Sequence, residues 1–171
     1  NEMQEAVERL PETLKTAWAK DWSAGADLLH DAQSMFVLGR GLTLGVAQEA
    51  ALKFKETSGI HAEAFSMAEV VHGPMALVKS GFPLLIFPPL DKAAAGLDAI
   101  VRQFLGRDAR IAVAGQQFEK AVMLSLPERL NSVTAPIAMA QSFYAMVNAI
   151  SVKRGYDPDH PPMLQKVTET I

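Results

Sequence analysis

Short apolar runs that alternate with helix-like segments are the feature of this chain that most restricts its fold. Runs at residues 34–38, 83–87, 110–114 and 122–124 predict strands, and 60–65 alternates like a strand end. Helical patterns cover 44–58, 91–105 and 135–154. Strands separated by helices pair in parallel, with the helices covering both faces. The sequence therefore predicts the α/β class, with a doubly wound, mainly parallel, Rossmann-like sheet flanked by helices.

The two ends of the chain differ from its middle. Residues 1–30 have helical spacing interrupted by Pro11, and we interpret them as packing or linking helices. Residues 31–154 form the predicted domain, and 155–171 are a proline-rich tail that we expect to dock onto it. A length of 171 residues fits one such domain. Because the chain opens with Asn1 and not methionine, we expect it to be a fragment of a longer protein.

Composition excludes several classes of protein. With 16 basic and 19 acidic residues, no cationic face for nucleic acid is indicated. The chain has no cysteine, which removes disulfides, thiolate metal sites and cysteine nucleophiles, and is compatible with a reducing cytoplasm, the location we expect. The longest apolar stretch, 136–152, carries Gln141, Ser142 and Asn148, so it predicts a buried helix and not a membrane span.

A glycine-rich turn, Gly39-Arg40-Gly41, lies between the first predicted strand and its helix. Free backbone amides and the helix dipole at such a turn can hold a phosphate or sugar hydroxyls, although the glycines can equally serve only a tight turn. The spacing is not the dinucleotide fingerprint, and no acidic residue follows at the end of a second strand. We therefore predict no nicotinamide cofactor, and no other cofactor is indicated.

Ionisable residues gather at the ends of the elements that follow this turn. Glu49, Lys53 and Glu56 fall on one helical face, as either a solvated ion-pair stripe or a functional group would. Glu56 occupies the last helical turn, where the helix dipole disfavours an anion by about 0.3 to 1 kcal/mol. Helix stability therefore does not explain this residue. Groups at the ends of such elements can converge on one crevice, the usual place for chemistry in an open α/β sheet.

Two histidines lie on either side of a pair of acids. His61 and His72 flank Glu63 and Glu69, but no spacing places three metal ligands on one element, so we predict no metal site. His72 precedes a Gly-Pro turn. It either caps that turn or transfers protons near neutral pH, where an imidazole titrates.

Taken together, these motifs resemble the C-terminal sugar isomerase (SIS) domain of the double-SIS proteins. That group includes the isomerase part of glutamine:fructose-6-phosphate aminotransferase and the related amino-sugar-phosphate deaminases. The resemblance covers nearly the whole chain. It is carried by the tail and by Gly39-Arg40-Gly41, Ala51-Leu52-Lys53-Phe54-Lys55-Glu56, His61-Ala62-Glu63-Ala64 and His72-Gly73-Pro74.

The resemblance implies a sugar-phosphate site shared between subunits of a homodimer. Glu56 would be the base that moves a proton between C1 and C2, and His72 would reach into the partner subunit to assist ring opening. Lys53 would support the sugar and the developing enediolate. Lys166 in the tail would close over the substrate beside the Gln165 backbone. The phosphate-holding serines and threonines would belong to a preceding SIS domain, which these residues do not include.

Details of the resemblance favour one branch of the group. Pro162 replaces an arginine usual in the aminotransferase tail, and the segments 56–59, 64–66 and 167–170 look more like the deaminases. No glutaminase domain with its nucleophilic cysteine is present in these residues. We therefore expect deamination with isomerisation of glucosamine 6-phosphate. The isomerase domain of an aminotransferase is the second reading, and a sugar-phosphate-sensing module without catalysis is a third.

Overall fold

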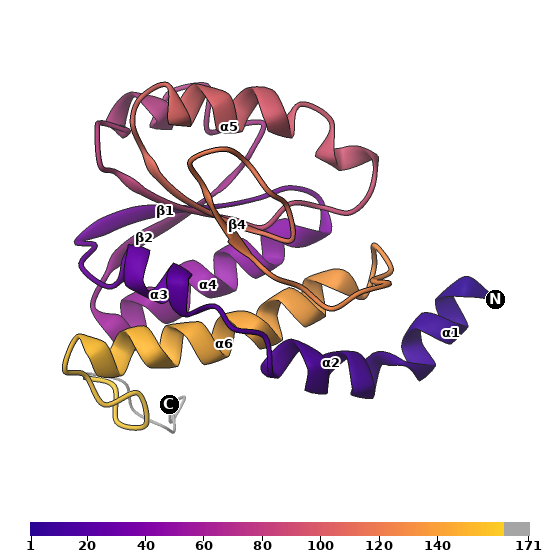
Figure 1. Cartoon of the computed structure of the whole chain (residues 1–171). Coiled ribbons are helices and arrows are strands. Elements are labelled where there is room, and N and C mark those ends of the chain that lie inside the picture. The colour runs from indigo at the N-terminus through magenta and orange to yellow at the C-terminus, as the bar shows by residue number, and fades with distance from the viewer. Residues whose placement is uncertain (163–171) are drawn as a thin grey trace, which may run out of the picture.

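A computed structural model describes residues 1–162 as a single layer of sheet between layers of helix (Figure 1). Helices α4 and α6 run side by side beneath the sheet, and α5 lies above it. The elements, in chain order, are α1 (Glu2–Glu8), α2 (Leu10–Trp18), α3 (Ser23–Leu29), β1 (Ser34–Gly39), α4 (Leu42–Ser58), β2 (His61–Ser66), the 3-10 turn η1 (Pro74–Leu77), β3 (Pro83–Ile86), the 3-10 turn η2 (Lys92–Ala94), α5 (Leu97–Leu105), β4 (Arg110–Ala114), β5 (Val122–Leu124) and α6 (Ala135–Lys153).

The five strands form one sheet in the order β2-β1-β3-β4-β5, and every neighbouring pair is parallel. The predicted α/β class with a parallel sheet flanked by helices is therefore confirmed. In the sheet, β2 lies next to β1 on one side, and β3, the next strand along the chain, lies next to β1 on the other side. This reversal creates a switch point between the loops that follow β1 and β3.

Alternation along each strand divides the interior into two cores. In β1, Val37 packs with α3, α4 and α6, whereas Phe36 and Leu38 pack on the opposite side, below α5 and the segment that follows β2. β3 and β4 repeat the pattern, because successive side chains of a strand point to opposite faces. The continuous apolar runs of the sequence therefore reflect a sheet buried on both faces.

The structure corrects the predicted helix at 91–105. Only Leu97–Leu105 is α-helical; Asp91 caps the separate turn η2 by accepting a hydrogen bond from the Ala93 amide at 2.8 Å. Gly96 then adopts a left-handed conformation with φ of 86°, which interrupts the helical path. At the N-terminus the break falls at Arg9, and Pro11 sits in the first turn of α2, where its missing amide hydrogen costs nothing.

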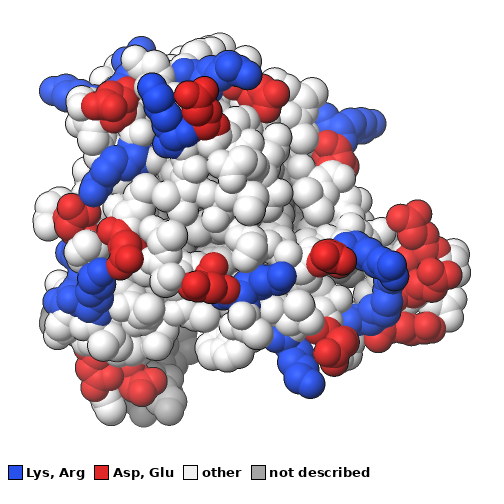
Figure 2. Space-filling model, viewed as in Figure 1, with Lys and Arg blue, Asp and Glu red and all other residues white. Residues whose placement is uncertain are grey.

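Surface charge and helix hydropathy bear on two partners considered in the sequence analysis, nucleic acid and the membrane. On the face shown in Figure 2, acidic and basic side chains are interspersed around a broad area without charges, so this face offers no continuous basic surface. None of the helices in residues 1–162 combines the length and the apolar character that a bilayer crossing requires.

Candidate functional site

Helix α4 presents the three ionisable residues picked out from the sequence. It leaves the carboxyl end of β1 and stops before the amino end of β2. Gly59 ends it with φ of 61°, and a Cβ at this position would collide with the Tyr156 hydroxyl. Glu56 therefore lies towards the amino edge of the sheet, away from the switch point.

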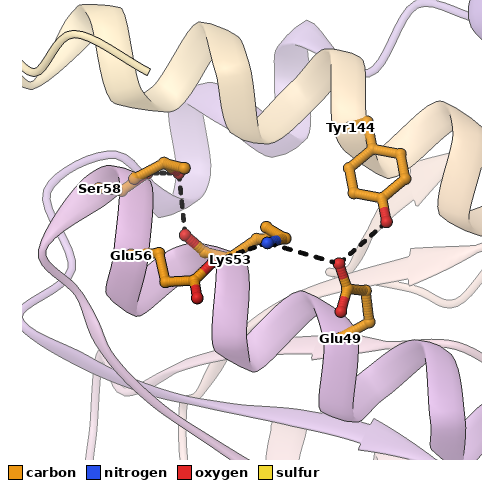
Figure 3. A network of polar contacts seen from close by, with 6 residues as sticks. Glu49, Lys53, Glu56, Ser58 and Tyr144 are labelled. Atoms are coloured by element: carbon orange, nitrogen blue, oxygen red, sulfur yellow. Dashed lines mark hydrogen bonds and ion pairs between the residues drawn. The ribbon is translucent and has the colours of Figure 1, made fainter. Parts of the chain in front are cut away.

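Lys53 and Glu56 form a close ion pair on α4 (Figure 3). The Lys53 Nζ donates to Glu56 Oε2 at 2.6 Å, and the two side chains are 30% and 20% exposed. The hydrogen bond to Glu56 raises the pKa of Lys53 above its ordinary value, although partial burial opposes the shift. This lysine is accordingly a cation at neutral pH. The pair is half-buried and not a fully solvated stripe.

Tyr144 on α6 completes a network that sequence reasoning missed. Its hydroxyl donates to Glu49 Oε1 at 2.9 Å, and the same oxygen lies 3.8 Å from Lys53 Nζ. Burial raises the pKa of Tyr144, and the hydrogen bond to Glu49 adds to the shift. No local pattern links residues 95 positions apart. The sequence signal is limited to a phenol within a largely apolar helix.

The end of α4 is fixed by hydrogen bonds from α6 and the turn beyond it. Ser151 Oγ donates to the Thr57 carbonyl at 2.6 Å, and Arg154 Nε donates to the Ser58 carbonyl at 2.7 Å. The same guanidinium also donates to the carbonyls of His30 and Ala32, at 2.6 and 3.0 Å. Carbonyls of the last helical turn lack partners within their own helix, so these donors stabilise the C-terminus of α4.

His72 lies on the other side of the sheet. Its neighbours Val70 and Met75 are buried in the core below α5, whereas Phe54 of α4 belongs to the opposite core. The imidazole is exposed, and within residues 1–162 no hydrogen bond or ion pair involves its side chain. Glu56 and His72 of one chain therefore do not share a crevice, and the expectation that His72 reaches into the partner subunit stays a prediction. Packing places them on opposite faces, because one follows β1 and the other follows β2.

The glycine-rich turn lies at the switch point and is tightly packed. A Cβ on Gly39 would collide with the Thr43 backbone, and Gly41 has φ of 58°. The Thr43 hydroxyl accepts a hydrogen bond from the Arg40 amide at 3.0 Å and lies 2.7 Å from the Phe87 carbonyl, joining the loops after β1 and β3. These contacts support the tight-turn reading, since the Arg40 amide is already paired.

Other predicted residues are either scattered or outside the described part. His61 and Glu63 approach each other to 3.4 Å at the surface. Across residues 1–162 no three side chains of metal-binding type gather in one place. Lys166 and Gln165 lie outside the described residues. Just before them, His160 Nδ1 and Asp157 Oδ2 are 2.9 Å apart, which raises the pKa of His160 and lowers that of Asp157.

Comparison with known proteins gives consistent results. The model of the SIS domain family matches residues 28–152. The glutamine--fructose-6-phosphate aminotransferase [isomerizing] of Thermococcus kodakarensis is 31% identical over 170 residues, which are 96% of this chain and 28% of that protein. A crystal structure from Silicibacter pomeroyi, assigned as a phosphosugar isomerase, is 40% identical with a TM-score of 0.83, covering 93% of this chain and 49% of that one.

A third relative shows the fold alone. Glucosamine-6-phosphate deaminase from Thermotoga maritima is 24% identical with a TM-score of 0.68, and the match covers 95% of this chain and 47% of that one. The chain thus spans half or less of the length of these three proteins. The matched family model, the parallel sheet and the relatives agree, and the chain belongs to the SIS domain family.

Proposed function

We propose that this chain carries the proton-transfer site of a phosphosugar isomerase, at the C-terminal end of α4. The observation that carries the proposal is the Lys53–Glu56 pair, a half-buried carboxylate held 2.6 Å from an ammonium where the helix dipole does not favour an anion. Aldose–ketose exchange needs such a carboxylate to take and return a proton, and a cation beside the oxyanion that develops. Relatives named for phosphosugar isomerisation or for an isomerizing aminotransferase support the substrate class.

In this proposal the ion pair is a resting arrangement. A sugar oxygen takes the place of the Glu56 carboxylate at Lys53, and the carboxylate then moves the proton between C1 and C2. Lys53 stays protonated throughout, because the ordinary pKa of a lysine already lies far above neutral pH. The lysine therefore supplies positive charge to the enediolate without taking part in the proton transfer.

Helix α4 would supply only part of the proposed site, and the other groups would come from a partner subunit, a second domain and the tail. His72 is proposed to enter the site of the partner subunit in a homodimer, which its exposed position on the opposite face supports. A preceding SIS domain would hold the phosphate, and Lys166 with the Gln165 backbone would close over the sugar. The chain's coverage of half or less of its relatives supports a second domain. The proposed location is the cytoplasm.

For the reaction we propose deamination of glucosamine 6-phosphate with isomerisation to fructose 6-phosphate. The isomerase step of a glutamine-dependent aminotransferase is the second candidate, favoured by the 31% identity to the Thermococcus enzyme. Both reactions would use the same Lys53–Glu56 chemistry. The deaminase releases ammonia from the sugar, whereas the aminotransferase transfers nitrogen from glutamine to the sugar. A sensing module would need a pocket for the sugar phosphate but no base.

The decisive experiment supplies glucosamine 6-phosphate to the complete natural protein and measures ammonia and fructose 6-phosphate. Release of both supports the deaminase. Glucosamine 6-phosphate formed only from fructose 6-phosphate and glutamine supports the aminotransferase. Binding of these sugars without turnover would contradict an enzyme and support the sensor. The isolated 171-residue chain should bind and turn over poorly, because the proposed phosphate-holding domain is not part of it.

A further inference from the structure

Lys53 has two carboxylates within reach and only one of them is bonded to it. Glu56 lies 2.6 Å from the Lys53 Nζ and Glu49 lies 3.8 Å from it (Figure 3). Both carboxylates come from the same helix face, one turn before and one turn after the lysine. An ammonium shared equally between them would be a weaker partner for Glu56 and for the oxyanion that develops on the substrate.

The Tyr144 hydroxyl is the contact that separates these two carboxylates. It donates to Glu49 Oε1 at 2.9 Å, and that oxygen is also the Glu49 atom nearest Lys53. A hydrogen bond from a phenol thus opposes the attraction that would draw Glu49 onto the lysine. α6 holds the ring in place, with Phe143 beside it packed edge-on against Phe54 of α4 at a ring-centroid distance of 5.3 Å.

Two other groups near the end of α4, Arg154 and His61, have partners of their own. The carboxylates that act on Lys53 are those of Glu56 and Glu49. The Arg154 guanidinium donates to three backbone carbonyls. His61 and Glu63 on β2 face each other. Within residues 1–162, Tyr144 is therefore the group from outside α4 that contacts the Glu49–Lys53–Glu56 set through a side-chain hydrogen bond.

We infer that Tyr144 is a positioning residue that holds Glu49 away from Lys53, so that the lysine serves Glu56 and the substrate. The inference rests on the proposed function for its kinetic consequence. Its structural part, the restraint on Glu49, stands independently of any reaction.

The kinetic test removes only the hydroxyl. In the complete natural protein, Tyr144→Phe should lower kcat about 3- to 10-fold, the effect of losing one ordinary hydrogen bond, while KM stays within about twofold. Tyr156→Phe is the matched control, because the Tyr156 hydroxyl makes no hydrogen bond within residues 1–162, and it should keep the parental kcat. An unchanged kcat in Tyr144→Phe would overturn the inference.

A second variant separates positioning from simple packing. Glu49→Gln removes the charge that competes for Lys53, so adding Tyr144→Phe to Glu49→Gln should change kcat by less than about twofold. If the loss persists in full in the double variant, Tyr144 acts by packing and the inference is wrong.

A structural measurement keeps the inference distinct from the proposed function. In a crystal structure of Tyr144→Phe, Glu49 should move from 3.8 Å to hydrogen-bond distance of Lys53 Nζ, about 3 Å, and the Lys53–Glu56 contact should lengthen. An unmoved Glu49 would overturn the inference even in an active enzyme. A protein without phosphosugar turnover would refute the proposed function and leave this structural result to decide the role of Tyr144.

Discussion

The two faces of the sheet hold their ionisable residues in different ways. On the face covered by α4 and α6, Glu49, Lys53 and Glu56 are joined to one another and to Tyr144 across the helix pair. On the face below α5, His72 lies in a turn. Its backbone amide donates to the Glu69 carbonyl, and its imidazole is exposed. One face presents a network fixed by its own chain, and the other presents a group held only through its backbone.

This difference indicates which parts of the proposed site a single chain can build. Two long helices packed against each other position several side chains at once, since each side chain's neighbours are also fixed. A turn fixes the path of the backbone but leaves an exposed imidazole free to meet another molecule. The contrast supports the proposed division, in which Glu56 serves its own subunit and His72 serves the partner.

Replacing the proposed base tests the helix face most severely. Glu56→Gln keeps the shape of the side chain but removes the base, so turnover should fall about 10²- to 10⁴-fold with substrate binding largely intact. Steady-state rates and exchange of solvent hydrogen at C2 measure the loss. Glu128→Gln, an exposed glutamate outside the network, is the control. A parental rate in Glu56→Gln would make the Lys53–Glu56 pair an ordinary surface feature.

Mixing two inactive variants tests whether His72 acts across subunits. Glu56→Gln and His72→Asn homodimers should each be nearly inactive. Random re-pairing in equal amounts should restore about a quarter of the parental activity, because half the dimers are mixed and each then has one intact site. If His72 serves its own chain, mixing restores nothing. Purely monomeric protein in sedimentation at concentrations that give full activity would also refute the shared site.

The rigidity of the helix face should depend on Arg154. Arg154→Lys keeps the charge but loses the fork that reaches the carbonyls of Ser58, His30 and Ala32, so the free energy of unfolding should fall by about 1.5 to 3 kcal/mol. Denaturant unfolding measures this change. The neighbouring variant Lys153→Ala breaks an exposed, solvent-screened pair with Asp27 and should leave the free energy of unfolding nearly unchanged. Equal losses in the two variants would show that the hydrogen bonds of the Arg154 guanidinium do not stabilise the fold more than an exposed ion pair does.

The smallest expected effect concerns an exposed histidine that, unlike His72, has a carboxylate partner. The hydrogen bond to Asp157 raises the pKa of His160 above 6.5. Because the folded-state pKa is the higher one, the stabilisation is complete below 6.5 and is lost as pH rises through the folded-state pKa. In NMR titrations Asp157→Asn should bring the pKa down towards 6.5, and Asp159→Asn should lower it less. An unchanged pKa in Asp157→Asn would show that the pair does not form in solution.

Local sequence patterns predicted much of the fold, and their failures have local causes. The strands and the long helices were predicted to within a few residues. Strands buried on both faces appear in the sequence as continuous apolar runs, and helices appear as apolar residues at helical spacing. The helix expected at 91–105 failed in its first half, because the left-handed conformation of Gly96 decided the path there. The roles of Lys166 and Gln165 stay predictions, since those residues lie outside the described part of the chain.

The sequence by itself determined the parallel α/β class, because its short apolar runs alternate with helical segments. It also placed Glu49, Lys53 and Glu56 on one face, because the helix has a period of 3.6 residues. Only the tertiary structure decided the strand order, the separation of His72 from Glu56 and the contacts that Tyr144 and Arg154 make with distant residues. The physical reason is that periodicity fixes which way a side chain faces within its own element. The partner it meets there depends on how helices from distant parts of the chain pack together.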